Sequence, residues 1–200
     1  GYVRAANEDR MGFTRTPFGN VYVVSDGMGG YRGGALAAEL TVSTLQERLA
    51  ALPPDSASFP DRVRDAFAAA NQAVLERRRP DDPDTRDMGA TGVVLVTAGA
   101  RALVGHVGDS RAYLVRHKGR ALRRLTRDHT RVQRMLDAGM LTPTQAADHP
   151  DASMLDRAIG HQPTVEVDVS GWIELKPRDM ILLCSDGLCG YVEDAEIGQV

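Results

Sequence analysis

The chain has 200 residues, 42% of them hydrophobic and 26% charged, and a formal net charge of −3 at pH 7. These values are typical of one soluble globular domain with a sizeable core. They argue against a nucleic-acid-binding protein, since the chain is not basic and only 5% of its residues are aromatic, and no apolar run approaches the roughly 20 residues that a membrane span needs.

Two helices are predicted after a first strand. The β-branched and aromatic residues of 20–25 favour the strand. Leucines on one face predict a helix over 33–52 that ends at the Pro-Pro pair 53–54. The second helix is predicted over 61–79, with Asp61 as its N-cap and an apolar stripe formed by Val63, Phe67, Ala70 and Val74.

Strands dominate the second half of the chain, after a polar loop over 80–87. The segment from 126 to 163 is expected to be irregular and partly helical. The predicted strands cover 91–97, 101–107, 111–116, 165–169 and 179–184, and the first three are interpreted as consecutive antiparallel strands joined by short turns. No repeat or linker divides the chain, so we predict a single α+β domain over residues 1–200, in which helices cover antiparallel sheets.

Acidic residues follow apolar strands at several points. Asp26, Asp109 and Asp186 each stand beside a glycine at a strand end, and Glu8 and Asp9 form a further cluster near the start. If the strand ends meet at one rim, the carboxylates converge, and like charges that close need a counter-ion. Oxygen ligands favour Mg²⁺ or Mn²⁺ over zinc. Each Asp-Gly pair, taken alone, could instead be an ordinary turn.

Two neighbouring features suit a metal site that acts on phosphate. Gly27, Gly29 and Gly30 would let the backbone turn tightly and bring carbonyl oxygens up to an ion. Arg4 precedes Glu8 by four residues, and its guanidinium could bind a phosphate through two hydrogen bonds. Taken alone, Arg4 would be interpreted as a surface arginine.

Other phosphate chemistries lack their motifs. The sequence has no Gly-x4-Gly-Lys-[Ser/Thr] loop, no Cys-x5-Arg arrangement at Cys184 or Cys189, and no Asp-x-Asp nucleophile pair after a strand. The two cysteines also lack partners at zinc-like spacing, so both are expected to be reduced thiols of a cytoplasmic protein. Of the phosphate chemistries considered, the attack of metal-activated water on a phosphoryl group is the one that the sequence still allows.

Five short segments stand in a characteristic order: GYVRAANED at 1–9, DGMGG at 26–30, GDSRAY at 108–113, LTRDH at 125–129 and CSDGL at 184–188. Each of these motifs is weak alone, but together they span nearly the whole chain. The set resembles the metal-dependent serine/threonine protein phosphatases of type 2C, and their bacterial branch in particular.

The resemblance implies a four-layer α-β-β-α sandwich, in which two antiparallel sheets are flanked by helices. It also implies two Mn²⁺ or Mg²⁺ ions at the rim of the sheets and a third, weaker ion. By position, Asp26 would bridge the two ions, the Gly27 carbonyl would bind one, and Asp186 would hold the second. The other implied residues are Asp109 for the third ion, Glu8 and Asp9 as direct or water-mediated ligands, and Arg4 for the substrate phosphate.

The chain departs from the family pattern at two places inside the sequence. Members from higher organisms carry a histidine, proposed as the general acid, where this chain has Met28. His106 and His129 are poor substitutes, so protonation of the leaving group is left to metal-bound water or an unidentified group. The insertion over 127–160 resembles the family's flap, with Ala-Ser at 152–153 where many bacterial members have Arg-Asn.

Two further features leave alternatives open. The family's Gly-x-Asp-Asn motif, whose Asp completes the second metal site, is not reached before Val200. We expect the sequence to omit the ends of a complete enzyme, and a truncated form with an incomplete site is the alternative. Between Arg111 and Arg134, nine Lys or Arg stand against one acid, and this stretch either attracts an acidic phosphosubstrate or forms a solvated face.

The sequence therefore predicts a metal-dependent phosphatase that hydrolyses phosphoserine and phosphothreonine in proteins by direct attack of a metal-bridged water. Its expected partners are phosphorylated proteins, with a serine/threonine kinase and its targets. We expect a cytoplasmic monomer that binds no nucleic acid. The alternatives are a non-catalytic phosphatase-like binding or regulatory domain and a regulator phosphatase that acts on anti-sigma-type antagonists.

Overall fold

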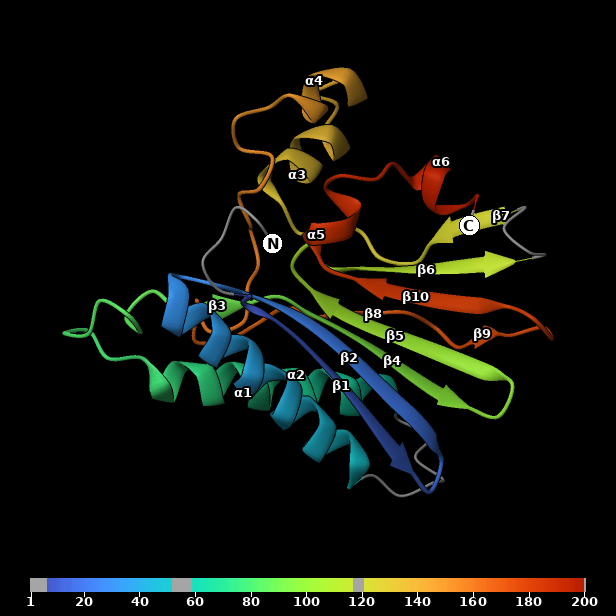
Figure 1. The fold of residues 1–200 in the computed structure, drawn as a ribbon, viewed down its shortest axis with the longest axis horizontal. Coiled ribbons are helices and arrows are strands. Elements are labelled where there is room, and N and C mark those ends of the chain that lie inside the picture. Colours follow the sequence, from blue (N-terminus) through green and yellow to red (C-terminus); the bar gives the residue numbers. More distant parts are fainter. Residues whose placement is uncertain (1–6, 52–58, 117–120, 200) are drawn as a thin grey trace.

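The computed structural model describes residues 7–51, 59–116 and 121–199. Two antiparallel sheets lie face to face, and helices cover the outer side of each sheet (Figure 1). This order of helix, sheet, sheet and helix confirms the predicted α-β-β-α sandwich.

Within the described residues, the larger sheet has seven strands and the smaller has three. The main path of the larger sheet is β1 (Asp9–Thr16), β2 (Gly19–Met28), β4 (Gly92–Ala98), β5 (Arg101–Val107) and β8 (Asp168–Val169), while β3 (Gly89–Ala90) pairs with β2 and β9 (Ile173–Glu174) pairs with β5. The smaller sheet has the order β10 (Met180–Cys184), β6 (Arg111–Arg116) and β7 (Ala121–Arg124).

The helices fall into three groups. The long helices α1 (Tyr31–Ala50) and α2 (Phe59–Arg77) cover the larger sheet, and the short helices α5 (Asp186–Cys189) and α6 (Asp194–Ile197) lie over the smaller one (Figure 1). The predicted irregular insertion contains α3 (Arg131–Asp137) and α4 (Pro143–Ala147). Among the described helices, none combines the length and the apolar character that a bilayer crossing requires.

Three apolar clusters fill the three interfaces between the four layers. The first lies between α1, α2 and the larger sheet, and it includes the predicted stripe on α2, which is fully buried. The second lies between the two sheets and is built mainly from β4 and β5, with Ile181 and Leu183 of β10 against it. The third lies between the smaller sheet and α5 and α6, around Tyr113, Cys184 and Ile197. Burial of these side chains holds the layers together.

Several predicted boundaries need correction. The second helix begins at Phe59, so Asp61 is not its N-cap but lies in its first turn, where a carboxylate still favours the positive end of the helix dipole. Strand β8 is shorter than the predicted 165–169. Strands β5 and β6 do not pair, because β5 belongs to the larger sheet and β6 to the smaller. The Pro-Pro pair 53–54 lies outside the described residues.

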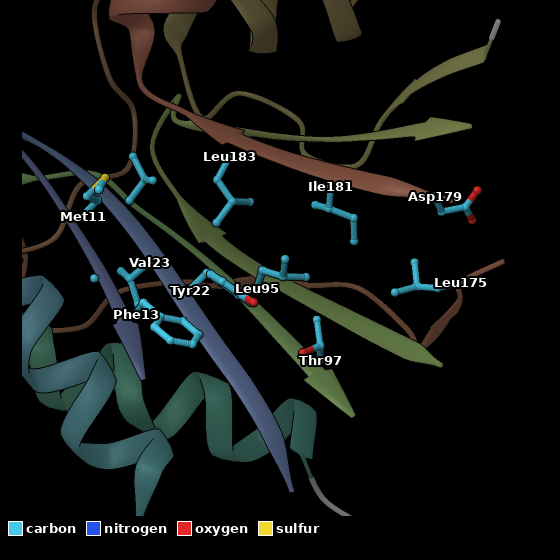
Figure 2. A pocket seen from close by; sticks show the side chains of 12 residues that line it. Met11, Phe13, Tyr22, Val23, Leu95, Thr97, Leu175, Asp179, Ile181 and Leu183 are labelled. Carbon is cyan, nitrogen blue, oxygen red and sulfur yellow. The ribbon is translucent and has the colours of Figure 1, made fainter. Parts of the chain in front are cut away.

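An apolar pocket of about 540 Å³ lies between the two sheets (Figure 2). Phe13 of β1 and Tyr22 of β2 line one side, with ring centroids 5.0 Å apart, and Ile181 and Leu183 of β10 line the other. Met11 also lines the pocket and is 84% exposed. Apolar surface therefore reaches solvent at this edge of the sandwich.

The basic stretch of the sequence is largely paired with acids. Arg111 and Arg124 both bind Asp128, and the Arg111–Asp128 contact measures 2.7 Å. Three more arginines pair with aspartates outside the stretch: Arg127 with Asp137, Arg131 with Asp151 and Arg134 with Asp156. These pairs argue against an open basic patch.

Candidate metal centre

The carboxylates that the sequence predicts to converge do so. Asp9 in β1 lies opposite Asp26 in β2 in the strand register, while Asp109 follows β5 and Asp186 begins α5. Asp26, Asp109 and Asp186 line one pocket of about 440 Å³ together with Glu8. Segments that are far apart in the sequence thus bring acidic side chains to one rim of the sandwich.

Asp26 is buried among other acids. It is 9% exposed and lines the same pocket as Asp186. Burial, Asp186, Asp9 and Asp109 all raise the pKa of Asp26 well above its ordinary value. Burial, Asp128 and Asp186 raise the pKa of Asp109 to about 6. Because these groups disfavour one another's charge, a divalent cation would stabilise them, and their oxygen atoms fit Mg²⁺ or Mn²⁺.

The glycines near Asp26 serve close packing as well as backbone freedom. A Cβ on Gly27 would lie 2.0 Å from the Gly34 carbonyl oxygen, and one on Gly34 would lie 2.7 Å from Glu8 Oε1. Helix α1 therefore approaches β2 through contacts that only glycine allows. Gly29 and Gly30 both have a φ of 101°, a conformation that L side chains rarely adopt. The predicted tight turn is confirmed, and the Gly27–Gly34 approach adds a reason that the sequence did not reveal.

A hydrogen-bond network around Thr91, which the sequence analysis missed, positions Asp26. The Asp26 amide donates to Thr91 Oγ1 at 2.9 Å, and the Thr91 amide donates to the Asp26 carbonyl at 2.8 Å. Thr91 Oγ1 also lies 2.6 Å from Ser110 Oγ, next to Asp109. The network joins two of the acidic segments. A threonine at the start of a predicted strand carries no local signal for this role.

His161 is a second residue that the sequence analysis did not single out. It lines the same pocket as Asp26 and Met28. Gly89 pairs with Met28 in the strand register, and a Cβ on Gly89 would lie 2.6 Å from the ring of His161. The imidazole therefore lies against the backbone beside Met28. Burial and the charge of Arg78 lower the pKa of His161.

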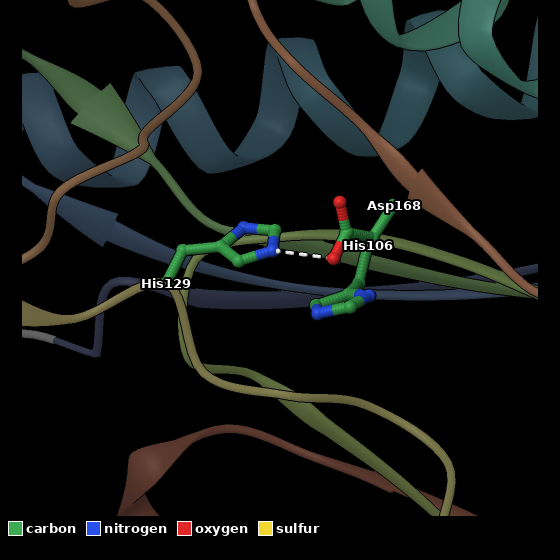
Figure 3. A group of neighbouring side chains, drawn as sticks. All are labelled: His106, His129 and Asp168. Atoms are coloured by element: carbon green, nitrogen blue, oxygen red, sulfur yellow. Dashed lines mark ion pairs between the residues drawn. The ribbon is translucent and has the colours of Figure 1, made fainter. Parts of the chain in front are cut away.

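His106, His129 and Asp168 form a separate cluster (Figure 3). The two imidazole rings stack with their centroids 4.5 Å apart, and His129 Nε2 lies 3.3 Å from an Asp168 oxygen. His106 is buried in β5, with Nε2 2.8 Å from the Arg127 carbonyl, and burial lowers its pKa to about 4. His106 is therefore a packed residue of the larger sheet.

The remaining contacts of this cluster mark it as an anchor for the insertion. The Gly108 amide donates to His129 Nδ1 at 3.1 Å, and the His129 amide donates to the Gly108 carbonyl at 3.0 Å. Arg157 already binds Asp168 at 2.9 Å. The positive charge of Arg157 disfavours a metal ion beside Asp168. His129 Nδ1 accepts a hydrogen bond from the Gly108 amide, so this nitrogen is occupied. The cluster therefore ties residues of the insertion to the loop that carries Asp109.

Arg4, the predicted phosphate-binding residue, lies outside the described residues. The structure therefore brings together Glu8, Asp9, Asp26, Gly27, Asp109 and Asp186 from the predicted set.

Comparison with known proteins agrees with this geometry. The model of the protein phosphatase 2C family matches residues 3–197. The serine/threonine phosphatase stp of Listeria monocytogenes is 33% identical over 205 aligned positions, which cover all of this chain and 79% of that protein. The crystal structure of the Mycobacterium tuberculosis serine/threonine phosphatase PstP/Ppp has 35% identity and a TM-score of 0.84, over 98% of this chain and 79% of that chain.

A structure of the PstP catalytic domain in complex with two manganese ions is 32% identical, with a TM-score of 0.80, and covers 100% of this chain and 79% of that chain. The family match spans nearly the whole sequence, and the carboxylates converge as the family motifs predict. The chain belongs to the protein phosphatase 2C family and is an enzyme of the serine/threonine protein phosphatase type.

Proposed function

We propose that this chain hydrolyses phosphoserine and phosphothreonine in proteins with the help of two divalent ions, Mn²⁺ or Mg²⁺. The observation that carries the proposal is the buried Asp26 carboxyl, which lines one pocket with Asp109 and Asp186 and has a raised pKa because of its burial and its acidic neighbours. The manganese ions in the similar PstP domain support the same choice of metal. Asp9, Asp26 and Asp186 would hold the two ions, and Asp109 would support a weaker third.

The chain's own residues would divide the remaining work. When bound, divalent ions acidify water and neutralise charge on a transferring phosphoryl group. The Gly27 carbonyl and Glu8 would complete the set of oxygen donors, directly or through water. Arg4 would orient the phosphate through its guanidinium. Water would attack phosphorus directly, so no side chain would carry a covalent phosphoryl group.

His161 is our candidate for protonating the serine or threonine oxygen that leaves. Its ring lies beside Met28, in the pocket lined by Asp26 and Asp186. An imidazole can donate a proton near neutral pH. His106 and His129 do not line this pocket, and their nitrogens bond to the backbone elsewhere. His161 directly follows the insertion over 127–160.

The test is release of phosphate from a phosphothreonine peptide with Mn²⁺ and then with excess chelator. We expect turnover that the chelator abolishes and that Asp186→Asn reduces at least about 100-fold. Asp81→Asn, in the exposed loop before β3, is the matched control and should retain activity. A chain that binds Mn²⁺ but releases no phosphate, even when extended beyond Val200, would instead be the non-catalytic binding domain.

The wider setting is also a proposal. A single domain, with the insertion over 127–160 as its flap, would act as a monomer on the targets of a serine/threonine kinase. The insertion supports a role in substrate choice, since Ser153 and Met154 line the carboxylate pocket. Both cysteines are free thiols, which supports a reducing, cytoplasmic location.

A further inference from the structure

Cys184 and Cys189 stand on either side of Asp186. Cys184 is the last residue of β10, and Cys189 is the last residue of α5, the single turn of helix that Asp186 begins. The segment between the two sulfur atoms therefore carries one of the proposed metal ligands. Both thiols are free.

The two side chains are neighbours in space. They belong to the same apolar cluster between the smaller sheet and α5, and each thiol lies near enough to shift the pKa of the other. Cys189 Sγ lies 3.4 Å from the Ser185 carbonyl oxygen, within the same turn. A disulfide between these neighbouring thiols would bring the two sulfur atoms to about 2.05 Å.

The two thiols differ in access. Cys189 lines a second pocket, of about 670 Å³, whose wall also includes Asp109 and Asp186. Cys184 is 7% exposed and does not line this pocket. A small oxidant that enters the pocket therefore meets Cys189 first, while Cys184 stays covered behind it.

We propose that Cys184 and Cys189 form a reversible disulfide when a peroxide enters this pocket, and that the disulfide withdraws Asp186 from the metal centre. The second half of this proposal rests on the proposed function of Asp186. Cysteine pairs that oxidise in a reducing compartment are typically sensors.

The chemistry needs only a peroxide as co-reactant. The Cys189 sulfur attacks one peroxide oxygen, the O–O bond breaks, and a sulfenic acid and water result. The Cys184 sulfur then attacks the sulfenic sulfur, the S–S bond forms, and a second water leaves with the remaining thiol proton. Two thiols supply two electrons, which reduce one peroxide to two waters. A thiol reductant reverses the change by exchange.

The effect on the metal centre follows from the shortness of the segment. Asp186 lies between the cysteines in a single helical turn, so a bond between their sulfur atoms must rearrange that turn. Asp186 and Asp26 line the same pocket and are close enough for Asp186 to raise the pKa of Asp26, and a displacement of the turn would separate the two. We therefore expect the oxidised chain to bind Mn²⁺ at least about tenfold more weakly and to lose activity in proportion.

The test begins with mass spectrometry, which does not depend on activity. No Lys or Arg occurs after Arg178, so one tryptic peptide carries both cysteines. Treatment of the metal-free chain with hydrogen peroxide should lower the mass of this peptide by two hydrogens, and dithiothreitol should restore it. Cys189→Ser should abolish the change, and Cys184→Ala serves as the second variant if Cys189→Ser misfolds. Oxidation that yields only sulfinic or sulfonic acids would overturn the proposal.

The second measurement is the Mn²⁺ affinity of the reduced and oxidised chains, by titration calorimetry. A disulfide with unchanged affinity would refute the link to Asp186. Cys189→Ser should keep its affinity after peroxide treatment, which controls for oxidation of exposed methionines. If the chain proved to have no phosphatase activity, the peptide mass would still decide whether the disulfide forms.

Discussion

Asp26 and Asp186 line the same pocket, and Asp186 raises the pKa of Asp26, although Asp26 lies in the larger sheet and Asp186 follows the last strand of the smaller one. Burial and the neighbouring carboxylates favour the protonated form of Asp26. In the absence of a cation, Asp26 therefore keeps its proton more readily than an ordinary aspartate does. A divalent cation would displace the proton and satisfy both groups.

Asp26→Asn should separate the cost of burying this acid from its contribution to metal binding. The metal-free variant should be more stable than the parent chain at pH 7.5, by about 1 kcal/mol or more, because an amide replaces a buried acid among acids. The stabilisation that Mn²⁺ gives to the parent should be lost, and turnover should fall at least about 100-fold. Thermal unfolding with chelator and with Mn²⁺, together with phosphate release, checks this. Turnover at the parent's rate would contradict the two-metal assignment.

Gly27→Ala should destabilise the protein through the contact between β2 and α1. The added Cβ would lie 2.0 Å from the Gly34 carbonyl oxygen, so the helix must move away from the strand. We expect a loss of about 3 kcal/mol in the free energy of unfolding, measured by urea denaturation. Gly171→Ala is the matched control, since no atom lies within 4 Å of its Cβ position. Equal effects at the two sites would contradict the packing argument.

Asp128→Asn should be costly because Arg111 and Arg124 both lose the carboxylate that they bind, although Arg111 keeps Asp194 at 3.7 Å. Asp128 accepts hydrogen bonds from Arg111 at 2.7, 3.1 and 3.2 Å and also binds Arg124. Its side chain is only 10% exposed. Removing one partner of such a buried pair typically costs about 3–5 kcal/mol. Asp65→Asn is the control: its partner Arg62 is exposed, so the substitution should lower the free energy of unfolding by less than about 0.5 kcal/mol. If Asp128→Asn cost no more than Asp65→Asn, Asp128 would have no structural role.

His106 should make the protein acid-sensitive. Burial lowers its pKa from 6.5 to about 4 in the folded state. Between these values the unfolded chain binds the proton and the folded chain does not. Stability is therefore lost as the pH falls from about 6.5 to about 4, by roughly 3 kcal/mol. His106→Gln should flatten this part of the curve of unfolding free energy against pH. The raised pKa values of Asp26 and Asp109 change stability with pH in the opposite direction, but they contribute equally in the parent and in His106→Gln. A slope that is the same in both proteins would therefore contradict the lowered pKa of His106.

His161→Gln should affect substrates according to their leaving group. A phosphothreonine peptide releases a poor leaving group that needs a proton, whereas p-nitrophenyl phosphate releases a good one. We expect kcat to fall about 100-fold for the peptide and far less for the aryl phosphate. Mn²⁺ affinity should stay unchanged. His149→Gln, in the insertion, is the control. Equal losses on both substrates would mean that His161 positions other groups and does not donate the proton.

Local signals in the sequence indicated the α+β arrangement and the candidate metal-binding acids, while the four-layer sandwich was implied by the family resemblance. The stripe from Val63 to Val74 repeats at the period of one helix face, and it is buried as predicted. Asp26, Asp109 and Asp186 each follow an apolar strand, and strand ends in a layered domain meet at a rim. Local chemistry therefore pointed to a metal-dependent phosphatase before any contact was known.

Only the tertiary structure decided which distant segments meet. Strands β5 and β6 are consecutive and look alike, yet they belong to different sheets. Thr91, His161 and the pair of Cys184 and Cys189 acquire their roles from neighbours that the chain brings together by packing. Hydrophobic periodicity specifies which face of an element is buried, but it does not specify which other element buries it. That choice depends on the whole set of long-range contacts.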